Sequence, residues 1–247
     1  VTGGGRDDWI DKEVKSIINL EIPKFEIIVC GGKYKGKYKD KVKYVSFDHK
    51  LAWITKKKNL ICENAKYENL IITHDRFIFD KNWYQGIKKY GNYFEVLSCI
   101  IRDIRGRRAD DWVAFERDKD GVYGTPGHLD YRDWDKNSYV DGGLYILKKS
   151  VWERCKWDES FEGDSTEDAQ MSKDFEQNGF IIRFNPFSSC KTLKERGNWS
   201  KFKFNKHRFI LPQDRPLKTR IKNWIKKNSI RYIVRGRILD DQLRIKI

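Results

Sequence analysis

The sequence predicts an α/β fold in which helices flank a mostly parallel sheet, followed by a basic helical extension at the C-terminus. Short apolar runs that end in glycine or polar residues alternate with segments whose apolar residues recur at helical spacing. Strands that alternate with helices in this way are typical of parallel sheets covered on both faces. Charge indicates the extension, because residues 201–247 hold 15 Lys and Arg against three Asp, a net of +12 out of +15 for the chain.

Strands and helices follow from these patterns in turn. Apolar, β-branched runs predict strands at 25–30, 42–47, 70–73 and 93–101. Helical spacing of apolar residues predicts helices at 7–20, 56–69, 80–91 and 165–179. The last helix is the best marked, with Ser165 as its N-cap, acidic residues in its first turn and Gly179 placed to end it.

Between the fourth strand and the acidic helix, residues 102–141 form a long polar stretch rich in Asp, Arg, Gly and Trp. A segment of this length without a regular pattern is usually functional in a compact domain, so we expect a lid or binding loop.

Length and composition indicate one large globular domain over residues 1–200, followed by the extension 201–247. The chain has 247 residues, of which 39% are hydrophobic, and this suffices for a sizeable core. Its five cysteines are scattered and include no C-x-x-C pair, so we expect a reduced, cytoplasmic protein without a zinc knuckle. No run approaches the roughly 18 apolar residues that a membrane span needs, and any membrane contact is expected to be peripheral.

An acidic residue ends one of the predicted strands, in the stretch LIITHDRFIF at 70–79. Ligands of parallel α/β sheets bind at the carboxyl ends of the strands, and Asp75 sits at such an end. Ionised carboxylates are almost never buried without a partner. We therefore expect Asp75 either to face water or to hold a cation.

Several short segments occur in an order that resembles the GT-A fold glycosyltransferases, family 2 in particular. They are VTGGG (1–5), IPKFEIIV (22–29), Lys57-Lys58-Asn59, Thr73-His74-Asp75, VDGGLYILKK (140–149) and Thr166-Glu167-Asp168. No single segment is specific, but their order over about residues 1–190 is similar to that family. The resemblance implies a GT-A fold with a Rossmann-like sheet, and the transfer of a sugar from a nucleoside diphosphate sugar.

In similar enzymes the acidic pair that opens the last helix binds and deprotonates the acceptor. The resemblance makes Asp168 the candidate general base, which takes the proton of the acceptor hydroxyl while the nucleotide leaves from the opposite face. Glu167 would orient the acceptor or the sugar. The alternative is that both acids only complement the helix dipole. Asp75 is the candidate ligand of Mn2+ or Mg2+, which would neutralise the diphosphate and assist its departure.

The remaining matches imply contacts with the nucleotide sugar. The candidates for these contacts are Thr2, Gly3, Asp48, Lys58, Asn59, His74, Asp75 and Gly143. Glycines after Thr2 would let the backbone approach the nucleotide closely. Lys57 or Lys58, with Asn59, would contact the diphosphate or the base. A solvated lysine face and a purely structural glycine turn are the alternatives.

The stretch 102–141 offers further candidates for contacts in a sugar transferase. His128 and Tyr131 are candidates to contact the acceptor, although a lone histidine in a loop is more often merely exposed. Trp112 and Trp134 are candidates for a sugar-stacking platform, although packing within the core or loop is the favoured role of both.

The sequence departs from the family pattern at several positions. Thr73 stands where the first carboxylate of the D-x-D signature is usual, so one potential metal ligand is missing. The segment CGGKYKG replaces the base-binding Asp after the second strand, and Asp48 after the third is its candidate substitute. Cys190 and Lys191 stand near the place of a third metal ligand, and Lys191 would itself neutralise phosphate. The Q-x-x-R-W motif and membrane helices of processive members are absent, which favours the addition of a single sugar.

The extension contains a predicted basic amphipathic helix at about 215–230. Leu217, Ile221, Trp224 and Ile225 form an apolar stripe flanked by lysine and arginine residues. Such a helix suits an anionic membrane surface, where lipid-linked acceptors reside. Packing of the stripe against the catalytic domain is the favoured alternative. Attraction to nucleic acid phosphates is a third, and it would allow a DNA-base glycosyltransferase.

These expectations describe an inverting, non-processive glycosyltransferase that moves one sugar to a hydroxyl acceptor, such as a glycan, a lipid-linked molecule or another glycoconjugate. It would be cytoplasmic, with peripheral attachment to the membrane as a further hypothesis. A sugar nucleotidyltransferase shares the α/β layout, but TGGGRDD lacks the second half of the expected glycine-rich loop. A degenerate transferase domain that acts as a basic binding module fits Thr-His-Asp in place of D-x-D.

Overall fold

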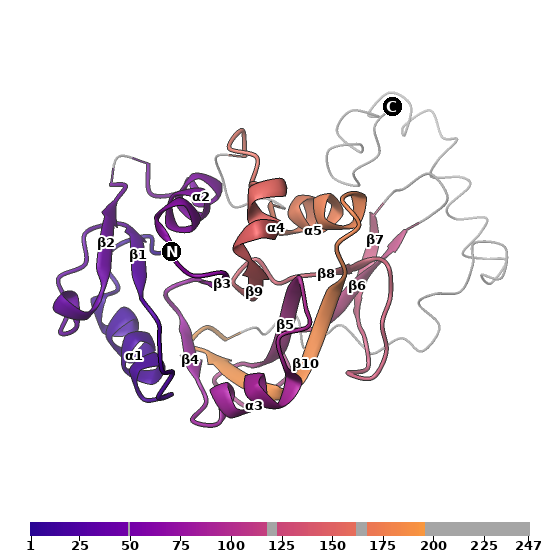
Figure 1. Cartoon of the computed structure of the whole chain (residues 1–247), viewed down its shortest axis with the longest axis horizontal. Coiled ribbons are helices and arrows are strands. Elements are labelled where there is room, and N and C mark those ends of the chain that lie inside the picture. Colours follow the sequence, from indigo (N-terminus) through magenta and orange to yellow (C-terminus); the bar gives the residue numbers. More distant parts are fainter. Residues whose placement is uncertain (49, 118–122, 162–166, 196–247) are drawn as a thin grey trace, which may run out of the picture.

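The computed structural model describes residues 1–48, 50–117, 123–161 and 167–195. Its helices are α1 (Asp7–Ile18), α2 (Ile54–Asn64), α3 (Trp83–Tyr90), α4 (Lys149–Arg154) and α5 (Glu167–Gln177), with a 3-10 turn at Lys39–Lys41. Its strands are β1 (Ile28–Gly31), β2 (Lys43–Ser46), β3 (Asn69–Thr73), β4 (Phe77–Phe79), β5 (Val96–Arg102), β6 (Val113–Arg117), β7 (Tyr123–His128), β8 (Ser138–Tyr139), β9 (Leu144–Lys148) and β10 (Ile182–Thr192). Helices lie on both sides of the central sheet (Figure 1).

The central sheet has five strands in the order β3-β9-β5-β10-β4. β5 and β10 pair in parallel, whereas β9 runs antiparallel to β3 and β5, and β4 runs antiparallel to β10. β1 and β2 form a separate parallel pair. The start of the chain joins this pair to the central sheet: the Val1 amine donates to the Thr73 carbonyl at 2.8 Å, and the Thr2 amide donates to the Cys30 carbonyl at 2.9 Å.

The joined sheet has one dominant strand direction. The Asp75 amide donates back to the Val1 carbonyl at 3.1 Å, and Thr2 bridges Gly31 in parallel. β1, β2, β3, β5 and β10 therefore run the same way, with β4 and β9 reversed. This arrangement confirms the predicted α/β class with a mostly parallel sheet. The carboxyl ends of β1, β2 and β3 meet at one edge, where the predicted ligand site lies.

The predicted strands and helices are present with shifted bounds. The helix predicted at 56–69 ends earlier, at Asn64, because Ala65 is extended and the residues after it lead into β3. The end of α5 agrees with the prediction for Gly179, whose φ is +78°. The Gly179 amide donates to the Glu176 carbonyl at 3.0 Å and the Phe180 amide donates to the Phe175 carbonyl at 2.9 Å, which is the Schellman pattern of helix ends.

Residues 102–141 are where the structure departs from the prediction of an irregular loop. They contain β6, β7 and β8, which form a separate antiparallel sheet in the order β7-β6-β8. The sequence hides β7 because it reads YGTPGH, and glycine and proline are rare inside strands. An edge strand tolerates proline, since one side of its backbone needs no partner. β7 holds such an edge position.

Hydrophobic side chains pack on both faces of the central sheet. On one face α2, α4 and α5 cover a cluster that includes Trp152 and Phe175. On the other face α3 packs against β10, and its Trp83 belongs to the second cluster. Val96 and Leu97 are successive residues of β5 and belong to opposite clusters, as the alternation of side chains along a strand requires. A third cluster joins α1 to β1. The sheet is therefore a rigid platform for the residues at its edge.

Further sequence expectations concern the cysteines, the membrane and the extension. All five cysteines are buried as free thiols. Within the described part of the chain, no helix has the length and apolar character needed to cross a membrane. Ser165, Thr166 and the extension 201–247, with its predicted helix at 215–230, lie outside the described residues.

A cavity of about 640 Å³ opens between β1 and β3. Its walls include residues 24–28 and 69–73, with further side chains from α1, α2 and α3, and they are largely aliphatic and aromatic. None of the predicted site residues lines this cavity. The candidate site described below is therefore a different place on the molecule.

Candidate active site

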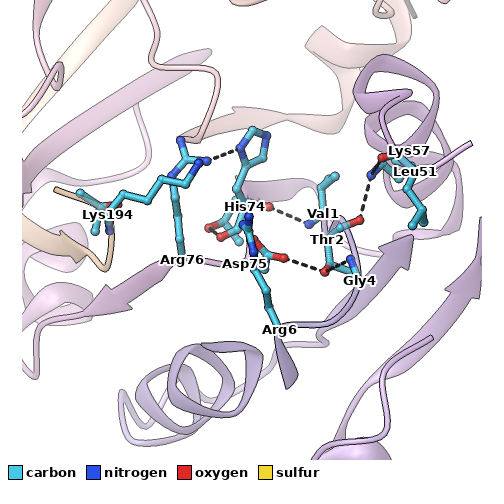
Figure 2. Close-up of polar contacts among 12 residues, drawn as sticks. Val1, Thr2, Gly4, Arg6, Leu51, Lys57, His74, Asp75, Arg76 and Lys194 are labelled. Atoms are coloured by element: carbon cyan, nitrogen blue, oxygen red, sulfur yellow. Dashed lines mark hydrogen bonds and ion pairs between the residues drawn. The ribbon is translucent and has the colours of Figure 1, made fainter. Parts of the chain in front are cut away.

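The carboxyl ends of β1 and β3 meet at the start of the chain. The Thr2 hydroxyl donates to Oδ2 of Asp75 at 2.6 Å and accepts from the Gly4 amide at 3.0 Å (Figure 2). Gly31 lies directly against Thr2, because a Cβ built on Gly31 would stand 2.1 Å from the Thr2 carbonyl oxygen. Its φ of +129° also falls in the region that favours glycine. Close backbone contact thus explains glycine at this position.

Asp75 is buried at this edge, with 6% of its surface exposed, and it has protein partners. Arg6, just before α1, places Nη1 3.3 Å from Oδ1 of Asp75, while Thr2 takes Oδ2. A buried carboxylate needs such partners. Arg6 is therefore a cationic partner of Asp75 that the chain itself supplies. Sequence reasoning missed Arg6, whose only signal is a basic residue within GGGRDD.

His74 and Arg76 lie together on the side of the β3 end opposite to Thr2 (Figure 2). Nη1 of Arg76 is 2.8 Å from Nδ1 of His74, and the His74 amide donates to the Gly143 carbonyl at 2.9 Å. A Cβ on Gly143 would stand 2.4 Å from Nη2 of Arg76, so the guanidinium packs against this glycine. Burial, with a smaller contribution from the positive charges of Lys58 and Arg76, holds the pKa of His74 well below its usual range. Arg76 was also missed by sequence reasoning.

Two consecutive lysines of α2 reach different parts of this region. Nζ of Lys57 donates to the Thr2 carbonyl at 2.8 Å. Nζ of Lys58 donates to the Gly142 carbonyl at 2.7 Å and to Oε1 of Glu167 at 2.8 Å. Both side chains are buried, and burial lowers the pKa of Lys57. The solvated lysine face that the sequence left open as an alternative is therefore excluded for these two residues.

The acidic pair lies at the start of α5 against the glycine segment before β9. Oδ2 of Asp168 accepts from the Gly142 amide at 3.2 Å, and a Cβ on Gly142 would stand 2.6 Å from Oε1 of Glu167. Burial, followed by the negative charges of Glu167 and Asp141, raises the pKa of Asp168 to about 6. Oε2 of Glu167 has no hydrogen-bond partner among the described residues. Asp168 is partly exposed, and an accessible carboxylate with a raised pKa has the character of a general base.

Asn59 does not join this group, although the sequence predicted a contact with the nucleotide. Its Nδ2 donates to the Trp157 carbonyl and to Oε1 of Glu159, each at 2.9 Å. Its Oδ1 accepts from the Trp152 indole and the Trp157 amide, each at 3.1 Å. An amide side chain offers two donors and two acceptor positions. All four of these positions in Asn59 are occupied by hydrogen bonds that link α2 to α4 and to the segment after α4. This arrangement argues against the predicted contact.

The other predicted residues fall into a connected group and a rim. Hydrogen bonds and chain neighbours connect Thr2, Lys58, His74, Asp75, Gly143, Glu167 and Asp168. Asp48 is exposed at the end of β2, where the Tyr44 hydroxyl lies 3.0 Å from Oδ1 of Asp48 and 2.8 Å from the Gly31 carbonyl. Gly3 is exposed with open space around it. Asp48 and Gly3 thus border the edge without joining the network.

The candidates for acceptor contacts in 102–141 are mostly packed inside the protein. Trp112 is 1% exposed and Tyr131 stacks on Phe184 with ring centroids 4.6 Å apart. Nε2 of His128 lies 2.8 Å from the Ala109 carbonyl oxygen. Only Trp134 among these candidates is exposed, at 57%. The structure therefore gives Trp112, His128 and Tyr131 packing roles, and leaves the sugar-stacking hypothesis to Trp134.

The end of β3 offers limited ligands for a metal ion. Asp75 is the one carboxylate of the Thr-His-Asp segment. The Thr73 hydroxyl donates to Oε1 of Glu13 at 2.8 Å, so its hydrogen is directed to α1. Across the described residues, no group of three or more His, Cys, Asp or Glu side chains is arranged to hold an ion. Each carboxylate oxygen can accept more than one contact, so Asp75 fits a Mg2+ or Mn2+ ion whose other ligands are water and substrate phosphates.

Comparisons with known proteins bear on the fold. The sequence matches no protein-family model and no curated protein. Among solved structures, the chain is similar to GalNAc-T7 crystallised with UDP, GalNAc and Mn2+, with a TM-score of 0.55 and 15% identity over 76% of this chain and 41% of that one. It is also similar to TarS of S. aureus, with a TM-score of 0.54 and 13% identity over 78% of this chain and 35% of TarS.

A structure of TarS residues 1–349 gives a TM-score of 0.50 and 14% identity over 76% of this chain and 57% of that one. The chain thus spans about a third to just over half the length of the structures that it matches. At these identities the likeness concerns the fold alone. The fold is that of the GT-A glycosyltransferases, as the ordered segments of the sequence led us to expect.

Proposed function

We propose that the protein is a glycosyltransferase that moves one sugar from a nucleoside diphosphate sugar to a hydroxyl group, with inversion and without processivity. One observation carries the proposal. The strand end that bears Asp75 and the helix start that bears Asp168 are joined through Gly142 and Gly143. Transfer between two bound substrates needs a donor site and an acceptor base that are held next to each other, and these contacts support such an arrangement.

Asp168 acts in this proposal as the general base. It takes the proton of the acceptor hydroxyl, whose oxygen forms a bond to the anomeric carbon of the donor sugar. The bond between that carbon and the diphosphate oxygen breaks on the opposite face, which inverts the configuration. A pKa of about 6 leaves Asp168 ionised at neutral pH and makes it a stronger base than an ordinary aspartate.

The departing diphosphate needs positive charge around it. After burial, the positive charges of Lys58, Arg76 and Lys57 contribute to the lowered pKa of His74, and these residues would supply a positive field at the end of β3. Asp75 would hold Mn2+ or Mg2+ together with the phosphates, and the ion would act as a Lewis acid for the leaving oxygen. We expect Asp48 and Thr2 to contact the nucleoside end of the donor, because both lie by the Gly31 end of β1.

A degenerate domain that binds without turnover is the second candidate. The observation that favours it is the arrangement of Asp75, whose two oxygens are held by Thr2 and Arg6. In that case, binding of a nucleotide or another anion would not depend on a metal. Replacement of Asp168 would then leave the function unchanged.

The first experiment is calorimetric titration of UDP, GDP, CDP and TDP, each with and without Mn2+, followed by turnover with the matching sugar nucleotide. We expect one nucleotide to bind and the Asp168→Asn variant to retain that binding while turnover falls about a hundredfold or more. Asp174→Asn is the matched control, because Asp174 lies on the same helix outside the network and bonds Gln170. Equal turnover in the two variants would exclude Asp168 as the base, and binding without any turnover would favour the degenerate domain.

A further inference from the structure

The position of hydrogen on the His74 ring follows from its contact with Arg76. Nδ1 of His74 lies 2.8 Å from Nη1 of Arg76. A guanidinium has only donors and stays protonated in proteins. Nδ1 must therefore offer its lone pair and carry no hydrogen. The ring is then neutral, and its one hydrogen sits on Nε2.

Nε2 of His74 has no hydrogen-bond partner among the described residues, and the atom is buried. Buried donors are nearly always satisfied in folded proteins, and a missing partner costs about 1–3 kcal/mol. The Nε2–H group is therefore a buried donor that lacks an acceptor among the described residues. Burial is the largest influence on the pKa of the ring, and the positive side chains that act on it include Lys58, Arg76 and Lys57. A neutral donor in a positive field is suited to an anionic oxygen.

We propose that Arg76 fixes His74 in its Nε2–H form and that this N–H donates a hydrogen bond to a phosphate oxygen of the bound sugar nucleotide. The proposal rests on the glycosyl transfer proposed above and assigns His74 a positioning contact within it. It also has a consequence for the metal. His74 has no lone pair left for an ion while Arg76 occupies Nδ1, so any ion at this strand end relies on Asp75 and on the substrate (Figure 2).

The hydrogen position is testable without any ligand. The 247-residue chain labelled with 15N in its four histidines gives one set of ring nitrogen signals for each histidine in two-bond 1H–15N spectra. The His74 set is the one that is lost in His74→Gln. We expect an Nδ1 without hydrogen and an Nε2 that carries it. An Nδ1–H ring or a doubly protonated ring at neutral pH would overturn the proposal.

The phosphate contact is tested with a pair of isosteric substitutions. Glutamine places an N–H donor where Nε2–H stands, whereas asparagine offers an acceptor near Nδ1 and loses that donor. The probe is inorganic pyrophosphate, which all nucleoside diphosphate donors share in chemical form, titrated with EDTA and again with Mn2+. We expect His74→Asn to weaken binding about tenfold or more, and His74→Gln to keep most of the affinity of the unaltered chain.

His128→Asn is the matched control, because His128 is a buried histidine whose Nε2 faces the Ala109 carbonyl and not this site. Its affinity for pyrophosphate should be unchanged, and melting curves check that each variant is folded. Equal binding by the unaltered chain and His74→Asn would overturn the His74 contact and leave the glycosyl transfer standing. If neither pyrophosphate nor any nucleoside diphosphate binds the unaltered chain, both proposals fail.

Discussion

Lys58 is a fully buried charge whose partner is the candidate acceptor-side acid. Its ammonium bonds Oε1 of Glu167 and the Gly142 carbonyl, and it lies 5.4 Å from the centre of the Trp157 ring. Such a pair contributes little net stability when intact, because both charges have lost their water. Removing one member is costly, since the other charge is left buried without compensation.

We therefore expect Lys58→Met to lower the free energy of unfolding by about 3–5 kcal/mol, measured by urea denaturation. The double variant Lys58→Met with Glu167→Gln should recover part of that loss, because no charge is then left unpaired. Lys56→Met is the matched control: its ion pair with Glu159 at 2.9 Å is partly exposed, and such pairs contribute about 1 kcal/mol or less. Similar losses in the two single variants would contradict a buried ion pair at Lys58.

The pH dependence of turnover should follow the ionisation of the Asp168 carboxyl group. Burial and then Glu167 raise the pKa of Asp168 to about 6, and a general base must be ionised to act. Activity should therefore be full well above pH 6, about half of its maximum at about pH 6, and lower still as the pH drops further. The measurement is kcat/KM across the acid range at saturating metal. A profile that stays flat down to about pH 5 would show that another group takes the proton.

At the scale of an element, α1 carries an acid beneath the end of β3. Oε1 of Glu13 accepts from the Thr73 hydroxyl at 2.8 Å, and burial is the largest cause that raises the pKa of Glu13 to about 8. A pKa raised on folding means that the folded state holds the proton more tightly. The stability from that proton is full below the ordinary value of 4.5 and is lost as the pH rises through about 8.

Glu13→Gln should remove this loss, because the amide stays neutral and its oxygen can still accept from Thr73. We expect the melting temperatures of the variant and the unaltered chain to be close at about pH 5 and to separate in favour of the variant by about pH 9. Asp8→Asn is the control, since Asp8 lies on the same helix and is largely exposed. A difference that does not change with pH would mean that Glu13 keeps an ordinary pKa.

At the junction of β1 with the start of the chain, the backbone restricts position 31 to glycine. Gly31 combines a positive φ with a Cβ position only 2.1 Å from the Thr2 carbonyl oxygen. Gly31→Ala should therefore destabilise the protein by well over the roughly 1–2 kcal/mol that a positive φ alone costs, and should weaken nucleotide binding. Gly106→Ala separates the two effects, because Gly106 has a φ of +75° and open space around it. Equal unfolding free energies for these variants would show that Thr2 moves aside without cost.

At the scale of the whole molecule, short-range patterns predicted the sheet, its flanking helices and the edge where the site lies. Long-range pairs could not be predicted in this way. Arg6 and Asp75 are 69 residues apart in sequence, and Lys58 and Glu167 are 109 residues apart. No local spacing in the sequence can therefore predict either pair. Asn59 shows the same limit on a helix: it is next to Lys58 in sequence, yet it faces α4. Glycine and proline concealed β7, whose place at a sheet edge only the pairing reveals.

Helix α2 holds both halves of the site through neighbouring residues. Lys57 is attached to the chain start beside Asp75, and Lys58 to the glycine segment and Glu167. A small rotation or shift of α2 on binding of one substrate therefore changes the environment of the other. Under the proposed transfer, such coupling is reciprocal: the factor by which a sugar nucleotide changes acceptor affinity equals the factor by which the acceptor changes nucleotide affinity. One helix that contacts both halves of the candidate site is thus a physical route by which occupation of one half can alter the other.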